Sequence, residues 1–255
     1  MNNSHSKNIK VLSTYCDPIL RLTPVMMLTI FEEIADEHAM ELDIDAPTLR
    51  KRDKAYWVVR QVRLELNDVI RDHDDITVKT WPAEANGFRC GRSYQIFNQN
   101  QNHNHNQNHN HNQNEPVVKA FAEWVLIDSE TKKIRPANSI KSPDIQYIKG
   151  KAVETPLRRF KNIFTEDDFV YERIVRPCEI DVSHHTNNVK YCAMLLDSFS
   201  VKELEEMTIK ELEIYYEAES HEGETLRIYR KASGNGWQFM IKRDDSVVTM
   251  AFIGI

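Results

Sequence analysis

Glycine is scarce in this chain, and no glycine-rich phosphate-binding motif is present. Only seven of the 255 residues are glycine, and neither G-x-G-x-x-G nor a P-loop occurs. Such motifs use glycine to bring the backbone close to phosphate groups. The sequence therefore gives no support to nucleotide binding, and we expect no cofactor.

Long apolar runs are also missing. No stretch of about 18 apolar residues occurs, and the polar N-terminus lacks the apolar core of a signal peptide. The four cysteines are scattered without C-x-x-C spacing, which predicts buried free thiols in a reducing compartment. We therefore expect a cytoplasmic protein without a membrane segment.

Positive charge is in deficit, since the formal net charge is −6. This excludes nucleic-acid binding driven by bulk charge and leaves room only for a local basic patch. The apolar content of 41% and the charged content of 28% are those of an ordinary globular protein. The chain is long enough for a large core in one or two domains.

The first half of the chain has the pattern of one long helix followed by strands. Thr23 and Pro24 are typical of a helix start, and apolar residues then recur at helical spacing to about residue 42. His38 lies on that apolar face, where we expect a packed histidine with a satisfied ring. Strands are predicted at 8–16, 56–66, 75–81, 90–97 and 117–128, and 43–54 is predicted to be a charged connection. This is an α+β pattern with an antiparallel sheet.

An asparagine-rich tract interrupts these strands. Every even-numbered residue from 98 to 114 is asparagine. Such a tract has nothing to bury, so a disordered loop is expected. Four histidines lie in it, and flexible imidazoles can bind metal adventitiously but cannot form a fixed site without supporting groups. These are His103, His105, His109 and His111.

The second half repeats the order of the first. A segment at 136–165, rich in proline, lysine and serine, is predicted to be a linker. A strand at 169–175, a helix from about 187 to 199 and strands at 208–219, 225–232, 236–243 and 246–255 follow it. We therefore predict an internal duplication, with domains at 1–135 and 166–255.

A dense polar cluster lies just before the second helix. Residues 181–191 have the sequence DVSHHTNNVKY. Thr186 or Asn187 is the natural N-cap, and a helix N-terminus offers unpaired N–H groups that stabilise negative charge. Most polar clusters at this position are only caps, but this one supplies more polar groups than a helix end uses. The equivalent segment of the first half, 17–24, has neither histidine nor asparagine, so we expect chemistry in the second half alone.

The cluster resembles the active-site segment of acyl-ACP thioesterases, where ACP is acyl carrier protein, with the pattern D-x-N-x-H-x-N-N-x-x-Y. Two further segments resemble the same family, VKTWP at 78–82 and WVLIDSET at 124–131. The resemblance covers nearly the whole chain outside the asparagine-rich tract. It implies two tandem hotdog domains, each a long helix wrapped by an antiparallel sheet. The motif H-x-N-N alone also occurs in single-hotdog acyl-CoA thioesterases.

By this resemblance the catalytic groups are Asp181, His185 and Glu219, with Glu219 predicted to lie on a strand. Two positions depart from the family: its motif asparagine is Ser183 here, and the cysteine that follows its glutamate is Ser220. The absent cysteine argues against a covalent thiol mechanism. Because Ser183 replaces the family asparagine, an amide donor is missing near the expected oxyanion.

Thioester hydrolysis needs an activated water and stabilisation of the carbonyl oxygen. Our hypothesis is that Glu219 and His185 deprotonate the water and Asp181 orients local groups. Ser183 and backbone N–H groups near Asn187 would hold the carbonyl oxygen. Asn187 and Asn188 either fix the loop by capping or bind the substrate. His184 is expected to point outward, and no metal ligands are predicted in this set.

The resemblance further implies an acyl tunnel in the first half and an acidic ACP partner. Candidate tunnel residues are Met26, Met27, Phe31 and Trp57, all of which are also good core residues. Candidate docking residues are Arg89, Arg92, Arg158, Arg159 and Lys161. We expect a monomer or a homodimer that releases free fatty acid from acyl-ACP. The alternatives are an acyl-CoA thioesterase of the same fold and a non-catalytic acyl-binding protein.

Overall fold

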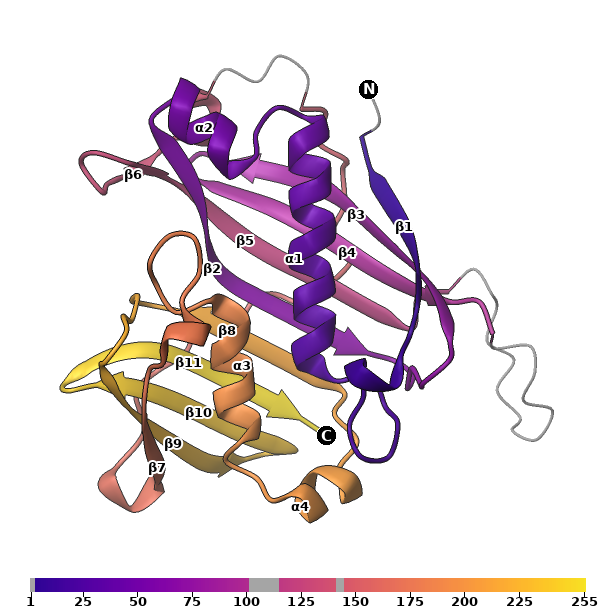
Figure 1. Ribbon diagram of the computed structural model, residues 1–255, viewed down its shortest axis with the longest axis vertical. Coiled ribbons are helices and arrows are strands. Elements are labelled where there is room, and N and C mark those ends of the chain that lie inside the picture. Colours follow the sequence, from indigo (N-terminus) through magenta and orange to yellow (C-terminus); the bar gives the residue numbers. More distant parts are fainter. Residues whose placement is uncertain (1–2, 101–114, 141–144) are drawn as a thin grey trace. The chain divides into compact units, whose positions relative to one another are not determined.

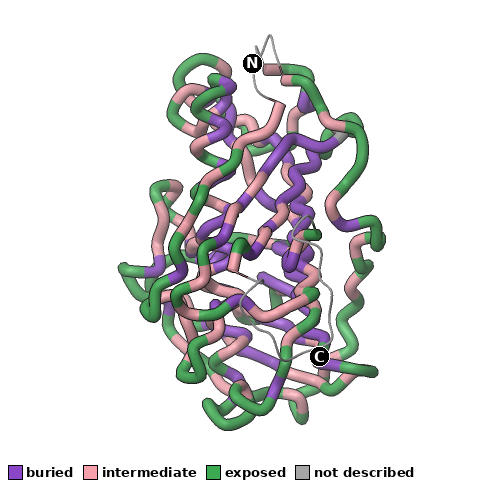
Figure 2. Tube along the Cα trace, turned by 90° about the vertical axis from the view of Figure 1, so that its right-hand side faces the viewer, coloured by how far each residue is buried: buried purple, intermediate pink, exposed green. Residues whose placement is uncertain are grey.

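The computed structural model describes residues 3–100, 115–140 and 145–255. They belong to two compact units, one made of Met1–Arg60 and Leu64–Thr155 and the other of Gln61–Arg63 and Pro156–Ile255. Exposed residues lie mostly in the turns, and buried residues lie mostly in the helices and strands (Figure 2). The predicted asparagine-rich loop lies outside the described residues from 101 to 114.

The first unit is an antiparallel sheet with one long helix against it (Figure 1). Its strands follow the order β1-β3-β4-β5-β2. Their bounds are β1 His5–Lys10, β2 Ala55–Leu66, β3 Asp75–Asn86, β4 Arg89–Asn98 and β5 Val118–Asp128, and the short β6 Ile134–Arg135 pairs with β5.

Helix α1 (Pro24–Glu41) confirms the helix predicted from the apolar spacing. The Thr23 hydroxyl accepts a hydrogen bond from Met26 N at 3.2 Å, and proline occupies the first helical position. The buried face includes Phe31, whose ring lies 4.7 Å from that of Tyr94 on β4. His38 is fully buried, and its Nδ1 lies 3.1 Å from Arg92 Nη1, which confirms a packed histidine with a polar partner.

Three local expectations for the first unit are wrong. Helix α2 (Ala46–Arg52) replaces the expected connection, and the chain after β1 forms a 3₁₀ turn, Ser13–Tyr15, instead of continuing as a strand. Strand β3 passes through Pro82, next to a break in register with β4 between Pro82 and Ala85. A proline is tolerated in a sheet at such a bulge because the ladder hydrogen bond is already missing there.

The second unit repeats this design, with the strand order β8-β11-β10-β9-β7. Its strands are β7 Phe169–Ile174, β8 Glu211–Tyr216, β9 Thr225–Ser233, β10 Gly236–Arg243 and β11 Ser246–Gly254. Helix α3 (Asn188–Leu196) buries Tyr191, Cys192 and Leu195, and the short α4 (Val201–Glu206) follows. Two units, each with a helix against an antiparallel sheet, make up the predicted α+β architecture.

Two further points concern the chain as a whole. Part of the predicted linker packs with the first unit, because Ile148 N donates to Pro82 O at 3.0 Å and Ala152 N donates to Ser93 Oγ at 3.1 Å. Of the cysteines, Cys90 and Cys192 are buried free thiols, whereas Cys178 is exposed and Cys16 half-buried. In the described part of the chain, no helix has the length and apolar character needed to cross a membrane.

Candidate active site

The loop before α3 is held by the carboxylate of Asp181. Its Oδ1 accepts a hydrogen bond from Ser183 N at 2.7 Å and a longer one from His185 N at 3.4 Å. Asp181 N donates to His185 O at 2.9 Å, and Ile180 forms a bridge with Thr186. An aspartate that binds backbone N–H groups a few residues ahead is a common way to stabilise a tight loop. The loop reverses the chain and presents His185 immediately before the helix.

The first unit contains the same loop with different chemistry. Asp17 Oδ1 accepts hydrogen bonds from Ile19 N at 3.1 Å and Arg21 N at 2.8 Å, and Asp17 N donates to Arg21 O at 2.8 Å. Leu20 and His184 occupy equivalent positions with φ of 63° and 64°, in the left-handed region that few residues other than glycine adopt. The backbone of this loop therefore does not depend on the histidines.

The loop between β8 and β9 also has a counterpart between β2 and β3. His221 N donates to Glu224 Oε2 at 2.9 Å, as Arg71 N donates to Asp74 Oδ2 at 2.8 Å. In the second unit Thr186 N donates to Ser220 O at 2.8 Å, and in the first Leu22 N donates to Ile70 O at 2.9 Å. These matching hydrogen bonds give atomic support to the predicted duplication.

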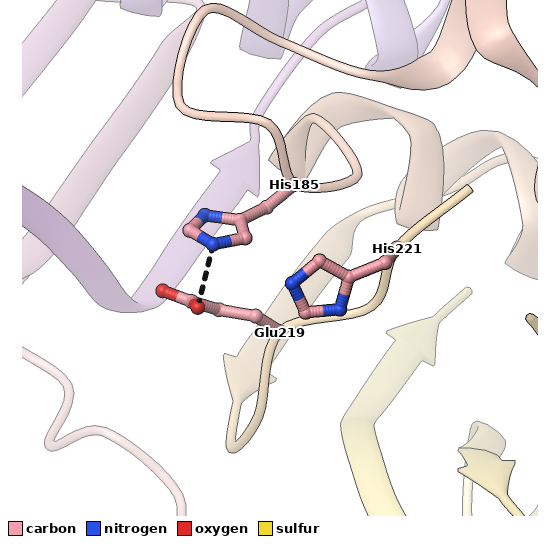
Figure 3. A group of neighbouring side chains, drawn as sticks. All are labelled: His185, Glu219 and His221. Carbon is pink, nitrogen blue, oxygen red and sulfur yellow. Dashed lines mark ion pairs between the residues drawn. The ribbon is translucent and has the colours of Figure 1, made fainter.

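The two loops of the second unit bring His185 and Glu219 together. His185 Nε2 lies 2.9 Å from Glu219 Oε2, and the two side chains are 22% and 47% exposed (Figure 3). The predicted pairing is therefore present, but Glu219 lies in the loop after β8, which ends at Tyr216. The strand-like alternation of residues in the sequence continues beyond the end of β8. The prediction that Glu219 lies on the strand is wrong for this reason.

His221 completes a group of three at this position. Its ring centroid lies 5.1 Å from that of His185, with the rings nearly perpendicular. In Figure 3 one ring nitrogen of His221 faces the His185–Glu219 pair. The equivalent residues of the first unit, by the matched hydrogen bonds, are Arg21, Val69 and Arg71. Sequence reasoning missed His221, because nothing in its immediate neighbours distinguishes it from a surface residue.

Behind the pair lies a buried set of hydroxyl groups. Ser220 is fully buried, and its Oγ lies 2.7 Å from both Thr186 Oγ1 and Tyr191 OH. Burial raises the pKa of the Tyr191 hydroxyl, which stays protonated and can donate. This set joins the loop before α3 to the loop after β8, and so supports the relative position of His185 and Glu219.

The start of α3 shows which of the two predicted residues is the N-cap. Asn187 is the N-cap, since its Oδ1 accepts from Val189 N at 2.9 Å. Thr186 instead faces Ser220, and Asn188 is the first helical residue. Arg243, a residue that the sequence did not single out, donates from Nη1 to Glu219 O at 3.0 Å and so fixes the backbone of the glutamate.

Two family models match almost the whole chain. The model described as acyl-ACP thioesterase N-terminal domain matches residues 2–139, and the acyl-ACP thioesterase C-terminal domain matches residues 164–251. The chain belongs to the acyl-ACP thioesterase family. The resemblance found in the sequence is thereby confirmed.

Two relatives of this acyl-ACP thioesterase family member are distant in sequence. An acyl-[acyl-carrier-protein] hydrolase of Cuphea viscosissima is 24% identical over 210 residues, which cover 78% of this chain and 48% of the relative. A palmitoyl-acyl carrier protein thioesterase of Cuphea hookeriana is 26% identical over 185 residues, or 40% of its length. The chain thus spans about half the length, or less, of these relatives.

Solved structures show the fold. An acyl-ACP thioesterase from Bacteroides thetaiotaomicron superposes with a TM-score of 0.84 at 21% identity, covering 99% of this chain and 98% of that one. A 12:0-ACP thioesterase from Umbellularia californica gives 0.82 at 17% identity, covering 100% and 97%. These likenesses confirm the predicted α+β fold of two tandem hotdog domains.

Other residues that the family resemblance proposed have different outcomes. Arg92 is buried and bonded to His38 and Thr80, so it is not available to dock a partner. Arg89 pairs with Glu123 at 2.9 Å and Arg158 with Glu211 at 2.8 Å, which leaves their docking role a prediction. Met27 and Phe31 are buried and Met26 and Trp57 half-buried, as core residues and tunnel residues alike would be.

Proposed function

We propose that the chain hydrolyses the thioester of an acyl chain carried by ACP and releases a free fatty acid. The observation that carries this proposal is the contact between His185 and Glu219, 2.9 Å apart, at a position reached by solvent. Membership of the acyl-ACP thioesterase family supports the choice of substrate. A water molecule must reach the reacting carbonyl, and partly exposed groups allow it.

In the proposed reaction Glu219, the more exposed of the two groups, takes a proton from water, and His185 holds the carboxylate in place. The water oxygen then bonds to the thioester carbon. The bond from that carbon to sulfur breaks, and the proton passes to the leaving thiolate. Ser183 and the N–H groups at the start of α3 are proposed to stabilise the carbonyl oxygen, where a helix N-terminus favours negative charge.

A covalent route is disfavoured because the hydroxyl of Ser220 and the thiol of Cys192 are both buried. Ser220, at the position of the family cysteine, is fully buried and bonded to two other hydroxyl groups. Burial raises the pKa of Cys192 to about 12, so this thiol stays protonated and unreactive. These observations favour direct attack by water.

The test is turnover of a purified acyl-ACP by His185→Ala and Glu219→Val. The second variant copies Val69 of the matching loop, so it removes the carboxylate from a backbone that accepts valine. Removal of a general base typically costs 10²–10⁴-fold, and we expect kcat to fall by at least 100-fold in both. Arg21→Ala in the first unit is the matched control and should retain kcat. A kcat near that of the unmodified chain in either site variant would remove that residue from the mechanism.

Hydrolysis of the same acyl group carried by ACP and by coenzyme A distinguishes the proposed function from its alternatives. We expect a higher kcat/KM for acyl-ACP, and we propose ACP as the only macromolecular partner of a cytoplasmic monomer or homodimer. Equal or higher kcat/KM for acyl-CoA would make the chain an acyl-CoA thioesterase. Tight binding of acyl-ACP without turnover would make it an acyl-binding protein.

A further inference from the structure

The proposed hydrolysis uses His185 and Glu219 but leaves His221 without a role. His185, Glu219 and His221 each offer one nitrogen or carboxylate oxygen, and these three atoms lie within 4.8 Å of one another. Across the described ranges, no other histidine, cysteine or carboxylate group comes together in this way. Two imidazoles with one carboxylate form a donor set that divalent zinc favours.

The distances suit a zinc ion after small side-chain rotations. Zinc binds nitrogen and oxygen at about 2.0–2.2 Å in a tetrahedron, which places neighbouring donor atoms about 3.4 Å apart. The His185–Glu219 separation of 2.9 Å is already shorter than this. Glu219 and His221 are both exposed, so their side chains can turn to close the remaining gaps without repacking the core.

The backbone that carries the ligands is fixed, and His221 has a second carboxylate behind it. Glu224 Oε1 lies 3.7 Å from His221 Nδ1, which leaves Nε2 to face the pair. A carboxylate that accepts a hydrogen bond from a ligating histidine orients the ring, and a small approach of Glu224 would close this contact. Glu224 Oε2 also accepts from His221 N, and Arg243 binds both Glu224 and the backbone of Glu219.

The first unit shows that the loops do not require this cluster. The same backbone hydrogen bonds there carry arginine, valine and arginine at the equivalent positions, and no donor set for a cation results. The convergence of two imidazoles and a carboxylate is therefore specific to the second unit. It is also not needed for water activation, because His185 and Glu219 already form the proposed base.

We propose that His185, Glu219 and His221 bind one zinc ion, which holds the site inactive until the ion is removed. The bound ion would occupy the Glu219 oxygen that lies against His185, and its positive charge would make the carboxylate a weaker base towards water. The inhibition rests on the proposed hydrolysis, whereas zinc binding does not. Mg²⁺ and Ca²⁺, which prefer oxygen ligands, should bind weakly.

The first measurement is zinc affinity by competition with a chromogenic chelator. The whole 255-residue chain is used with His103, His105, His109 and His111 replaced by asparagine, because that tract would otherwise compete for the metal. We expect one zinc ion per chain. His221→Gln, and independently His221→Arg, which copies Arg71, should weaken binding at least tenfold. The matched control is His184→Asn, since His184 is exposed in the same loop and asparagine tolerates its left-handed backbone.

The second measurement is hydrolysis at increasing free zinc, normalised to the metal-free rate of each variant. Zinc should inhibit at the concentration at which it binds, a chelator should restore the rate, and the His221 variants should need at least tenfold more zinc. Equal affinity in the His221 variants and His184→Asn, or no binding at one ion per chain, would overturn the zinc site. Activation by zinc would overturn the inhibition. If the metal-free chain does not hydrolyse acyl-ACP, the proposed function is wrong. The binding measurement would still test the zinc site in that case.

Discussion

Asp181 occupies the same place in its loop as Asp17 in the first unit, whose loop contains no histidine, and both carboxylates accept two backbone hydrogen bonds. The same hydrogen bonds form in the loop with His185 and in the loop without a histidine. The first role of this aspartate is therefore to stabilise the loop. The family resemblance assigns Asp181 a catalytic place, and the duplicated loop indicates that it acts by positioning His185. This comparison separates the two roles within one chain.

Asp181→Asn tests that interpretation. The amide keeps an acceptor oxygen but loses the charge, so we expect the free energy of unfolding to fall by about 1 kcal/mol. We expect kcat to fall about tenfold with little change in KM, because the histidine is displaced but present. Asp17→Asn should lower stability without lowering kcat. Loss of activity as complete as in His185→Ala, at unchanged stability, would instead make Asp181 part of the chemistry.

Ser220 gives a second prediction at the scale of one residue. Ser220→Ala removes a buried hydroxyl that contacts both Tyr191 OH and Thr186 Oγ1, and loss of such a hydrogen bond typically costs about 0.5–1.5 kcal/mol of stability. Turnover at a temperature where the variant is folded should stay within about threefold of the unmodified chain. Urea denaturation and acyl-ACP hydrolysis measure the two effects. A folded Ser220→Ala variant without turnover would show that this hydroxyl takes part in the reaction.

At the scale of elements, helices and strands were predictable where local signals agree. Thr23 and Pro24 mark the start of α1 through capping and fixed φ, and the apolar spacing sets its length. Helix α2 was missed because its seven residues are too few to show a period, although Asp45 caps it. The end of β8 was misplaced because alternation in the sequence outlasts the strand.

The candidate site was predictable only in part, for a related reason. His185 and Asp181 fall in one motif, but Glu219 is separated from them by more than 30 residues and was assigned by family resemblance. His221 and Arg243 belong to the site through contacts that have no sequence period at all. Residues that come together only through folding carry no local pattern in the sequence. The sequence alone therefore predicts the residues of the motif and not their distant partners.

The loop after β8 depends on a charged pair that can be titrated. Burial acts to raise the pKa of Glu224, but hydrogen bonds from Arg243 and from His221 N outweigh it, and the net pKa lies below the usual 4.5. A carboxyl group with a lowered pKa in the folded state stabilises that state above its unfolded pKa, and loses the contribution as the pH falls. The loop should therefore loosen in acid.

Glu224→Gln measures this contribution. At pH 7 the variant should be less stable than the unmodified chain in urea denaturation, since it lacks the charge that binds Arg243. The difference between the two proteins should stay constant down to about pH 4.5 and narrow below it. Glu205→Gln, on the exposed face of α4, is the control for the loss of one surface charge and should keep the stability of the unmodified chain at pH 7. A difference that persists unchanged to pH 3 would contradict the assignment to this carboxylate.

At the scale of the molecule, the second unit includes three residues that come early in the chain. Gln61–Arg63 belong to it together with Pro156–Ile255. Glu213 on β8 is fully buried and accepts from Gln61 Nε2 at 2.7 Å, Arg63 Nη1 at 3.0 Å and Arg158 N at 2.7 Å. The residues of the first two bonds are 152 and 150 positions apart, so the sequence offered no sign of them.

This arrangement predicts that residues 156–255 do not fold when produced alone. Removing one partner of a buried charge costs about 3–5 kcal/mol, and the fragment loses both Gln61 and Arg63. The free energy of unfolding of a typical small domain is only about 5–15 kcal/mol. Circular dichroism with urea denaturation should show no cooperative transition for the fragment. Because the cause is a carboxylate that keeps Arg158 but has lost two of its partners, the same fragment with Glu213→Met should recover part of the transition. A native fragment as stable as its Glu213→Met form would show that the second unit needs no early residues.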